Sequence, residues 1–381
     1  MERSKEIELL SQTLELAKNK QSFAIGEETL MPVSKYTDPA RFELERDVLF
    51  RKAPCLIAHS SQIAVPGQFI TRDVYGTPML LVRDRDGTAK AFANVCRHRG
   101  ATVETRESGH CKRFVCPYHA WTYNTDGSLA AVRHSDGFPS LDMAQTSLKP
   151  LQCFEEAGFV WVVPDASTKI DFADFFPEPL LDEFRWLGCE DVVVFETDTR
   201  VWKANWKIIL DGGLESYHFK IAHKNTIGDF FIDNGATYDF QGPHVRSVLP
   251  RITLSGLEHL PQDQWRIREH TNLLYGVFPN TSLLVQVDHV VLIQTTALSI
   301  DETKIEMSTL VPKDKCETDK AKRHWAANHE LTVRALNEDF EMGERIQRGM
   351  HSGVNEHFRF ARFEGALTEI HKIIDDKLAR A

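Results

Sequence analysis

Two short segments of the sequence each place a cysteine close to a histidine, a pattern that can bind metal. The first is CRHRG, which begins at Cys96, and the second is CPYHAW, which begins at Cys116. Together they read Cys-x-His, 17 intervening residues, then Cys-x-x-His. Two such halves on facing loops could coordinate one tetrahedral zinc ion, or a cluster of two irons and two sulfides with both imidazoles on one iron. The spacing alone leaves both alternatives open.

A second group of metal-binding side chains lies downstream in NWKIILDGGLESYHFKIAH, residues 205–223. Glu215 and His218 are three residues apart, so they would share one face of a helix. His218 and His223 are five residues apart, which on a straight helix turns their side chains about 140° away from each other. One metal ion can therefore bind both imidazoles only if the helix ends or widens after His218. The spacing is weak evidence by itself, because the segment HWAANHE repeats it.

A carboxylate that could complete this second group occurs in NEDFEMGERIQRG, a stretch with a helical pattern. The stretch offers four acids, which are Glu338, Asp339, Glu341 and Glu344. Spacing does not select one acid from the four.

Taken together, these motifs resemble a known family. CRHRGATV and CPYHAWTYNTDGSL resemble the Rieske motif of ring-hydroxylating oxygenases, and the surrounding strand sequences resemble that domain too. Asn-Trp-Lys, an acid, and then Glu-x-Tyr-His-x4-His resemble the mononuclear-iron motif of the same family, in the right order along the chain. The chain is therefore expected to be the alpha subunit, the terminal oxygenase, of such a system.

The resemblance implies the cofactors and their ligands. The ligands of one [2Fe-2S] Rieske cluster would be Cys96, His98, Cys116 and His119. The ligands of one mononuclear Fe(II) would be His218, His223 and Asp339. The other three acids of the 337–349 stretch would then lie on solvated helix faces, and Cys111 would be a bystander.

Glu215 and Asp211 are the candidate catalytic residues. Glu215 matches the carboxylate that, in this family, bridges the iron site to the Rieske histidine of a neighbouring subunit. Asp211 is expected near the iron without binding it, because a further donor would crowd out dioxygen. Gly212 departs from the family pattern, in which an Asn commonly follows the acid. The bridge requires subunits placed head to tail, and the resemblance implies a closed homotrimer.

The cluster is expected to have a low reduction potential. Respiratory-chain Rieske proteins carry an extra cysteine near the cluster and a serine that donates a hydrogen bond to a sulfide. Ala101 and Trp121 stand at those two positions here. Because hydrogen bonds to the sulfurs raise the potential, their loss places this cluster toward the low end of the Rieske range.

Composition excludes several other classes of protein. The 45 Lys and Arg residues against 55 Asp and Glu give a net charge of −10, which argues against nucleic acid as a partner. No apolar run approaches the roughly 20 residues of a membrane helix. The seven scattered cysteines do not form a disulfide framework, so we expect a soluble, cytoplasmic protein. No G-x-G-x-x-G motif precedes a helix, so electrons should come from a separate NAD(P)H-driven reductase, with or without a ferredoxin.

The chain is expected to have an α+β fold, whose strands and helices hold these residues in place. Residues 42–164 read as short β-rich runs with hairpin signals in RDRDGTAK and YNTDGSL, which predicts an antiparallel β Rieske domain. Residues 165–381 predict a helix-grip-like catalytic domain, an antiparallel sheet framed by helices at 201–224 and 318–350, with strands between 240 and 312. Residues 1–41 predict a helical segment that packs with the catalytic domain.

The predicted activity is oxygen insertion from O2 into a small organic substrate, as a mono- or dioxygenase. An aromatic substrate, as in aromatic compound catabolism, is favoured slightly by Phe219, Phe230, Phe231 and Tyr238 near the iron motif. A quaternary-ammonium substrate is the alternative, because aromatic residues can also surround a cation. A third alternative is a Rieske electron-transfer protein whose second domain is not catalytic.

Overall fold

The computed structural model describes residues 1–380, which divide into two compact units. The smaller unit contains Phe50–Phe176 and Leu187–Val193. The larger unit contains Met1–Leu49, Pro177–Trp186 and the chain from Val194 onward. Each unit has its own β-sheet and its own hydrophobic core. No helix within residues 1–380 is both long enough and apolar enough to cross a membrane.

The smaller unit contains a seven-stranded antiparallel sheet and a three-stranded one, as the β-rich runs predicted. The order of the large sheet is β2-β11-β10-β5-β4-β3-β6, and the small sheet is β7-β8-β9. The strands are β2 (Cys55–His59), β3 (Gln68–Val74), β4 (Thr77–Arg83), β5 (Ala89–Ala93), β6 (Ser108–His110), β7 (Arg113–Val115), β8 (Thr122–Asn124), β9 (Leu129–Ala131), β10 (Pro150–Glu156) and β11 (Phe159–Val163). Both predicted hairpins are present, since β4 pairs with β5 and β8 with β9. A short helix, α4 (Phe172–Phe175), follows β11.

The larger unit is built on a second seven-stranded antiparallel sheet, with the order β12-β18-β17-β16-β15-β14-β13. Its strands are β12 (Val192–Trp202), β13 (Thr237–Gln241), β14 (His244–Pro250), β15 (Thr271–Val277), β16 (Thr281–Val285), β17 (Val290–Ser299) and β18 (Glu302–Pro312). A two-stranded sheet joins β1 (Thr29–Pro32) to β19 (His357–Phe360). The helices are α1 (Arg3–Asn19), α2 (Ser34–Thr37), α3 (Pro39–Glu45), α5 (Glu178–Trp186), α6 (Trp206–Gly213), α7 (Phe219–Ala222), α8 (Ile267–His270), α9 (Asp319–His351) and α10 (Gly365–Ala379). The predicted strand region is interrupted by short helical segments between β14 and β15.

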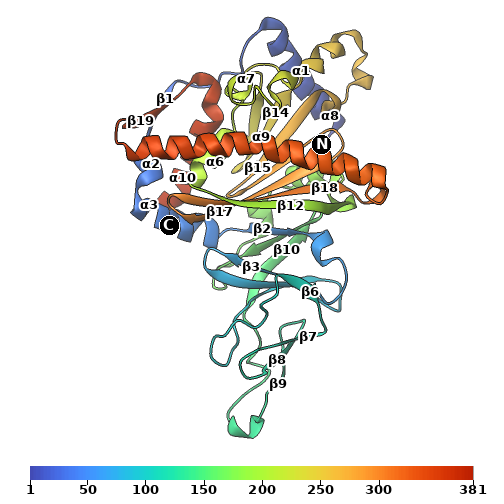
Figure 1. Ribbon diagram of the computed structural model, residues 1–381, viewed down its shortest axis with the longest axis vertical. Helices are drawn as coiled ribbons and strands as arrows, with labels where there is room; N and C mark the ends of the chain where they lie inside the picture. The colour runs from blue at the N-terminus through green and yellow to red at the C-terminus, as the bar shows by residue number, and fades with distance from the viewer. Residues whose placement is uncertain (381) are drawn as a thin grey trace. The chain divides into compact units, whose positions relative to one another are not determined.

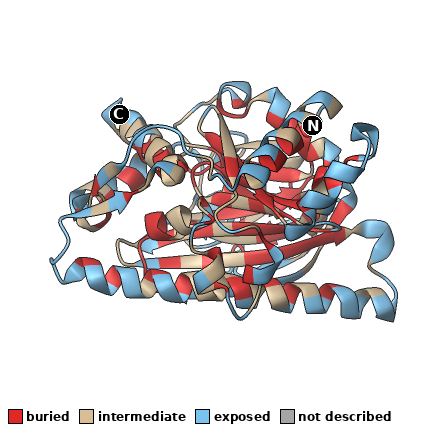
Figure 2. Ribbon diagram, turned by 90° about the horizontal axis from the view of Figure 1, so that it is seen from above, coloured by how far each residue is buried: buried red, intermediate tan, exposed pale blue. Residues whose placement is uncertain are grey.

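The long helix α9 lies across this sheet (Figure 1). It begins at Asp319, where the Thr318 side chain accepts a hydrogen bond from the Ala321 amide and caps the first turn. Its buried positions recur at helical spacing, so one face packs on the sheet and on α6 while the other stays exposed (Figure 2). Phe340 of α9 joins a core cluster with Trp202, Ile305 and Met307. The helix predicted at 318–350 is therefore confirmed.

The helix predicted at 201–224 is interrupted. Strand β12 continues to Trp202, α6 ends at Gly213, and α7 begins only at Phe219. Two glycines at the end of α6 weaken the helix there. The Glu215 carboxylate then accepts hydrogen bonds from the amides of Tyr217 and His218, which satisfies donors at the start of the next turn. The chain between α6 and α7 therefore forms a break in which Glu215 lies outside either helix.

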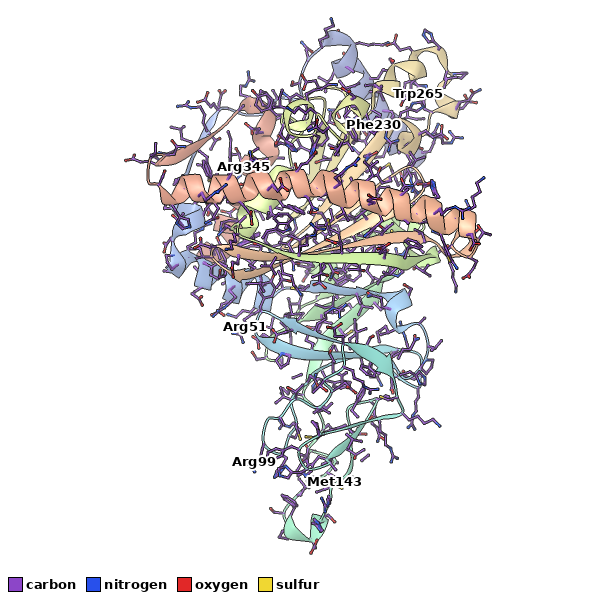
Figure 3. The ribbon with its side chains drawn as sticks, in the orientation of Figure 1. Arg51, Arg99, Met143, Phe230, Trp265 and Arg345 are labelled. Atoms are coloured by element: carbon purple, nitrogen blue, oxygen red, sulfur yellow. The ribbon has the colours of Figure 1, made fainter. Side chains whose placement is uncertain are left out.

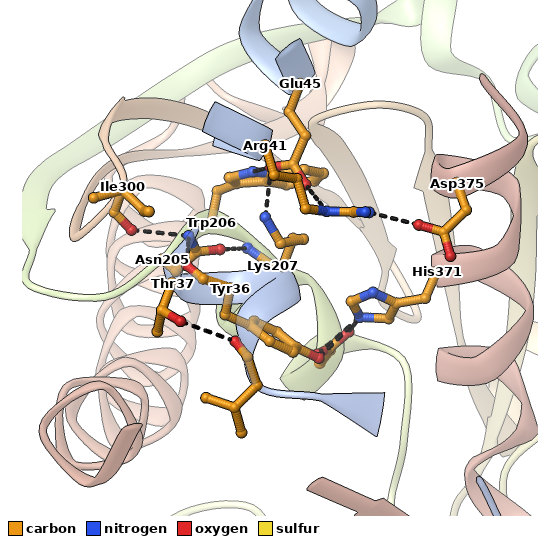
Figure 4. Close-up of polar contacts among 12 residues, drawn as sticks. Tyr36, Thr37, Arg41, Glu45, Asn205, Trp206, Lys207, Ile300, His371 and Asp375 are labelled. Carbon is orange, nitrogen blue, oxygen red and sulfur yellow. Dashed lines mark hydrogen bonds and ion pairs between the residues drawn. The ribbon is translucent and has the colours of Figure 1, made fainter. Parts of the chain in front are cut away.

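The Asn-Trp-Lys segment fixes the start of α6 (Figure 4). Asn205 caps the helix through the Lys207 amide, and its own amide group donates to the carbonyl oxygens of Tyr36 and Ile300. Trp206 Nε1 and Lys207 Nζ both bind one carboxylate oxygen of buried Glu45, at 3.0 and 2.5 Å. Burial lowers the pKa of Lys207, and the Glu45 carboxylate opposes this shift. The motif therefore positions α6 within the larger unit through buried polar contacts.

Candidate metal centres

Three side chains of the larger unit converge on one point that could hold a metal ion. His218, His223 and Asp339 each present a ligand atom, and these atoms lie within 4.8 Å of one another. Asp339 Oδ1 lies 3.2 Å from His218 Nε2 and 3.0 Å from His223 Nε2. His218 Nε2 is buried and has no partner in hydrogen-bond geometry. A buried nitrogen without a donor or acceptor partner is the arrangement expected of a metal ligand.

The interruption of the helix brings the two imidazoles together. His218 directly precedes α7 and His223 directly follows it, with backbone angles at His223 of φ −93° and ψ 20°. The two side chains are therefore not held 140° apart on a continuous helix, and their ring centroids lie 5.1 Å apart. The His-x4-His spacing required an interruption of the helix for both histidines to bind one metal ion. This requirement is met, because α6 ends before His218 and α7 has only four residues. Asp339 is supplied by the middle of α9.

Carboxylates also bind the other ring nitrogen of each imidazole. His218 Nδ1 contacts Glu215, and His223 Nδ1 lies 2.9 Å from Glu338 Oε2. The same Glu338 oxygen accepts a hydrogen bond of 2.6 Å from Thr226. The prediction that Glu338 lies on a solvated helix face was therefore wrong. A signal for this role was available, since a carboxylate commonly orients a metal-binding histidine through its second nitrogen.

The charges around this point favour protonated imidazoles. Burial opposes the charge on His218, but its contacts with Asp339 and Glu215 outweigh burial and raise the pKa of His218 to about 10. The pKa of His223 is likewise raised, with burial opposing and Asp339 and Glu338 favouring the charge. The two imidazoles lower the pKa of Asp339 against the effect of its burial. The site therefore concentrates negative charge that a divalent cation would neutralise.

Asp211 is held by two residues outside the three converging side chains. Its carboxylate accepts a hydrogen bond of 2.6 Å from the Tyr36 hydroxyl and lies 3.0 Å from His371 Nε2. Tyr36 and His371 are fully buried. Burial and the Asp211 carboxylate raise the pKa of Tyr36. The structure thus joins Asp211 to the N-terminal segment and to α10, and it gives Asp211 no contact with either candidate metal-binding histidine.

The second candidate centre lies on two loops of the smaller unit, near Arg99 in Figure 3. In the first loop the Cys96 amide donates to the Ala101 carbonyl and the Gly100 amide donates to the Cys96 carbonyl. In the second loop Cys116, Ala120 and Trp121 make the same pair of hydrogen bonds. The residue four positions after each cysteine has a positive φ, +75° at Gly100 and +58° at Ala120. The two loops therefore repeat one turn geometry.

The four predicted cluster ligands come together on these loops. His98 Nδ1 and His119 Nδ1 face each other at 3.1 Å, and both cysteines are buried. Burial raises the pKa of Cys116, and the neighbouring Cys96 adds to the effect. Two thiols and two imidazoles facing inward from paired loops fit an iron–sulfur cluster with both histidines on one iron.

Two aromatic residues beside the cysteines and histidines shape this centre. The Tyr123 hydroxyl lies 3.4 Å from Cys96 Sγ and accepts a hydrogen bond of 3.0 Å from the Arg97 amide. With the hydroxyl hydrogen directed at the sulfur, Tyr123 supplies one hydrogen bond that sequence reasoning missed. Trp121 stacks on the His98 ring at 5.0 Å between centroids. A stacked indole therefore occupies the place where a serine hydroxyl would have been.

A cavity of about 310 Å³ in the larger unit lies beside the first centre. His223 and Asp339 line it, together with apolar residues of α6, α7, α9 and the sheet. Phe219, Phe230 and Phe231, three of the four aromatic residues considered for the substrate, are among the lining residues, and Figure 3 labels Phe230. Tyr238 does not line the cavity and instead packs against Phe23 at 5.2 Å between ring centroids.

Comparisons with known sequences identify both units. Residues 53–155 match the Rieske [2Fe-2S] domain, and residues 189–380 match the ring hydroxylating alpha subunit, catalytic domain. The carnitine monooxygenase oxygenase subunit of Acinetobacter pittii is 39% identical over 192 residues, 49% of this chain and 51% of that protein. The anthranilate 1,2-dioxygenase large subunit of Acinetobacter baylyi is 31% identical over 199 residues, 50% of this chain and 42% of that protein. The match thus spans about half the length of these relatives.

Solved structures share the fold across nearly the whole chain. A quaternary ammonium Rieske monooxygenase in complex with an inhibitor superposes with a TM-score of 0.79 at 23% identity, covering 96% of this chain and 98% of that one. Naphthalene 1,2-dioxygenase from Rhodococcus sp. superposes with a TM-score of 0.73 at 20% identity, covering 93% and 88%. The Rieske cluster and the mononuclear Fe(II) are the cofactors of these two domains. The chain belongs to the family of ring-hydroxylating alpha subunits, with its Rieske domain preceding its catalytic domain.

Proposed function

We propose that this protein is the terminal oxygenase of a multicomponent system that inserts oxygen from O2 into a small organic substrate. The observation that carries the proposal is the convergence of His218, His223 and Asp339 beside a largely apolar cavity. Two imidazoles and one carboxylate are the ligand set of non-heme iron oxygenases, because they leave positions open for dioxygen and substrate.

The residues present fit the two cofactors. Cys96, His98, Cys116 and His119 are proposed to hold the Rieske cluster, and His218, His223 and Asp339 to hold Fe(II). When bound, the cluster supplies electrons one at a time and the iron supplies dioxygen activation. His218 Nε2 supports this assignment, because it is buried and faces Asp339 Oδ1 at 3.2 Å without hydrogen-bond geometry.

The chain's own residues prepare the iron site. Glu338 accepts from His223 Nδ1, and Glu215 contacts His218 Nδ1, so each imidazole is held with Nε2 directed at Asp339. These contacts fix the tautomer in which Nε2 is free to bind a metal. Phe219, Phe231 and Phe340 give the adjacent cavity much of its apolar wall. Dioxygen and substrate would thus meet in an apolar space next to one open edge of the ligand set.

Electrons are proposed to reach the iron site from a neighbouring subunit. Glu215 is half-buried beside His218, outside any helix, and we propose that it also accepts a hydrogen bond from a partner subunit's Rieske histidine. This requires a head-to-tail ring, for which we propose a homotrimer. One related structure is described as showing inter-subunit electron transfer, in a quaternary ammonium Rieske monooxygenase. A separate NAD(P)H-driven reductase, with or without a ferredoxin, is the proposed electron donor.

Two substrate classes are compatible with the residues that line the cavity. The phenylalanines that line the cavity suit an aromatic substrate, and anthranilate dioxygenase is among the relatives. The same side chains can surround a quaternary ammonium group, and relatives in Acinetobacter pittii and Chromohalobacter salexigens are carnitine and glycine betaine monooxygenases. Product masses from a reductase-coupled reaction with labelled dioxygen would separate dihydroxylation, with two labelled oxygens, from monooxygenation, with one.

The decisive experiment compares Asp339→Ala with Glu341→Ala, an exposed acid two positions further along α9. We expect the wild type and Glu341→Ala to hold three irons and two sulfides per chain, and Asp339→Ala to hold two irons and two sulfides. Turnover should fall at least about 100-fold in Asp339→Ala only, while the reduced cluster keeps its electron paramagnetic resonance signal.

The competing function makes the opposite prediction. A Rieske electron-transfer protein without catalysis would hold cluster iron only in the wild type, and Asp339→Ala would then change nothing. Full mononuclear iron and turnover in Asp339→Ala would instead show that the ligand assignment is wrong. Glu215→Gln separates the electron path from the iron site, because it should keep three irons and a reducible cluster while turnover falls.

A further inference from the structure

One charged side chain lines the cavity besides those of the metal site. Among the lining residues, all within the described part of the chain, Arg251 is the only Arg or Lys, and Asp339 is the only Asp or Glu. Arg251 directly follows β14 and is partly buried. A partly buried guanidinium is costly to desolvate unless something compensates its charge.

The protein supplies Arg251 with amide oxygens and no carboxylate. Arg251 Nε donates to Asn272 Oδ1 at 2.9 Å, and Nη2 donates to Asn272 and to Gln286 Oε1, the latter at 3.2 Å. Within residues 1–380 no Asp or Glu lies at ion-pair distance from it. Asp288 is the acid whose charge acts on Arg251, but its two carboxylate oxygens already bind His289 and His324, each at 2.8 Å. Burial lowers the pKa of Arg251, with Asp288 opposing, so the positive charge is poorly compensated.

The side-chain amides of Asn272 and Gln286 are oriented so that their oxygens are already used and only N–H donors remain available. Arg251 can only donate, so Asn272 must turn its oxygen toward the guanidinium. Asn272 Nδ2 then donates to Gln286 Oε1 at 2.9 Å, which directs Gln286 Nε2 away from this cluster. Each amide oxygen accepts two hydrogen bonds, and its lone pairs are used. Among the described residues Arg251 Nη1 and Gln286 Nε2 have no hydrogen-bond partner.

The donor cluster and the proposed iron ligands come from different elements of the cavity wall. Arg251, Asn272 and Gln286 come from adjoining ends of β14, β15 and β16, since Leu249 pairs with Asn272 and Leu273 with Val285. Asp288, two residues after Gln286, contacts His324 near the start of α9. Asn328 and Asp339 both line the cavity from α9, and eleven residues of helix span about 16 Å. One cavity therefore presents both the proposed iron ligands and donors that have no partner.

We propose that Arg251, with Gln286, binds a carboxylate of the substrate and places the carbon to be oxidised beside the proposed iron ligands. This deepens the proposed function and rests on it. A carboxylate fits better than a phosphate, because one guanidinium supplies one positive charge and an edge suited to two oxygens, whereas a dianion would need a second cation. The substrate is thus an elongated organic acid. A zwitterion fits when its cationic group lies among Phe219, Phe230 and Phe231, and a substrate that is only a cation does not.

The test measures binding of matched probes to the holoenzyme without turnover, by anaerobic calorimetry. The probes are 4-phenylbutyrate with 4-phenylbutyramide, and γ-butyrobetaine with its methyl ester. In the wild type, at least one carboxylate should bind about tenfold or more tightly than its neutral counterpart. Arg251→Gln should reduce that preference to about twofold or less, and Arg251→Lys should retain part of it.

Two further variants make the result specific. Gln286→Glu places a carboxylate against Arg251, so it should abolish the preference even if Arg251→Gln fails to fold. Arg268→Gln is the matched control, because Arg268 donates to the Gln286 backbone carbonyl but does not line the cavity, and it should keep the full preference. The proposal is wrong if neither carboxylate is preferred by the wild type, or if Arg251→Gln and Gln286→Glu keep the preference.

Iron content and the cluster signal are measured on the same samples. A wild type that lacks mononuclear iron but prefers carboxylates would overturn the proposed oxygenase function and leave the Arg251 assignment standing. A wild type with full iron and no carboxylate preference would overturn the Arg251 assignment and leave the proposed oxygenase function standing.

Discussion

His223 is held by two consecutive residues of α9, Glu338 at Nδ1 and Asp339 at Nε2, at 2.9 and 3.0 Å. Neighbouring residues on a helix point about 100° apart, yet both reach one imidazole because its two nitrogens face different directions. Glu338 and His223 are 115 residues apart in the sequence. A single turn of α9 therefore sets both the tautomer and the orientation of His223.

Loss of Glu338 should weaken iron binding without removing a ligand. We expect Glu338→Ala to lower the affinity for Fe(II) about 10- to 100-fold, because His223 loses the acceptor that orients it. Glu338→Gln should have a smaller effect, since the amide oxygen still accepts a hydrogen bond. Fe(II) titration against a competing chelator measures the affinity, and Glu341→Ala is the control. Equal affinities in Glu338→Ala and Glu341→Ala would contradict the role assigned to Glu338.

Tyr123 should raise the potential of the cluster. Its hydroxyl contacts Cys96 Sγ at 3.4 Å, and a hydrogen bond to a ligand sulfur stabilises the reduced, more negative state. About 1 kcal/mol for this bond corresponds to about 40 mV for one electron, so Tyr123→Phe should lower the potential by that order. Spectroelectrochemical titration measures it. Tyr118→Phe, at an exposed position beside His119, should leave the potential unchanged, and equal potentials in both variants would count against the assignment.

Ala120 should be a strained residue in the second cluster loop. It has φ +58°, in the left-handed region, where the equivalent residue of the first loop is Gly100. Left-handed backbone costs a non-glycine residue about 1–3 kcal/mol, and glycine loses about 0.5–1 kcal/mol of that advantage through chain entropy. We expect Ala120→Gly to raise the free energy of unfolding by about 1 kcal/mol in guanidinium denaturation of the holoprotein. Gly100→Ala should lower it, and the reverse signs would refute the argument.

His59 should make the stability of the smaller unit depend on pH. Burial lowers the pKa of His59, against the effect of its hydrogen bond to the Cys189 carbonyl. Its Nδ1 accepts from the Ser61 amide at 3.2 Å, so the neutral ring is the form that fits. The folded pKa lies below the unfolded value of about 6.5, so this contribution is present above pH 6.5 and is lost as the pH falls through the folded pKa.

The check compares thermal unfolding between pH 7.5 and pH 5.5. The wild type should lose more stability over this interval than His59→Asn, because the unfolded wild type takes up a proton that the folded state resists. His134→Asn, at an exposed position, should behave as the wild type does. If His59→Asn and the wild type lost the same stability over this interval, His59 would not be the source of the pH dependence.

Features that depend on short spacing could be predicted from the amino-acid sequence. The Cys-x-His and Cys-x-x-His halves, the hairpin signals around them and the helix at 318–350 could all be predicted, because turns, caps and periodicity are local properties. For the His-x4-His pair, the sequence predicted one shared metal ion only on the condition that the helix is interrupted between the two histidines. The interruption depends on Gly212, Gly213 and the capping by Glu215, which a helical pattern over 201–224 concealed.

Contacts between residues far apart in the sequence could be read only from the folded chain. Glu338, expected to face solvent, binds His223, and Asp211 binds Tyr36 and His371, two partners that no spacing along the chain indicated. Arg251, Asn272 and Gln286 carry no motif, and they meet only because antiparallel pairing brings three strand ends together. Spacing along the chain cannot predict such contacts, because they depend on how strands pair and how α9 packs on the sheet.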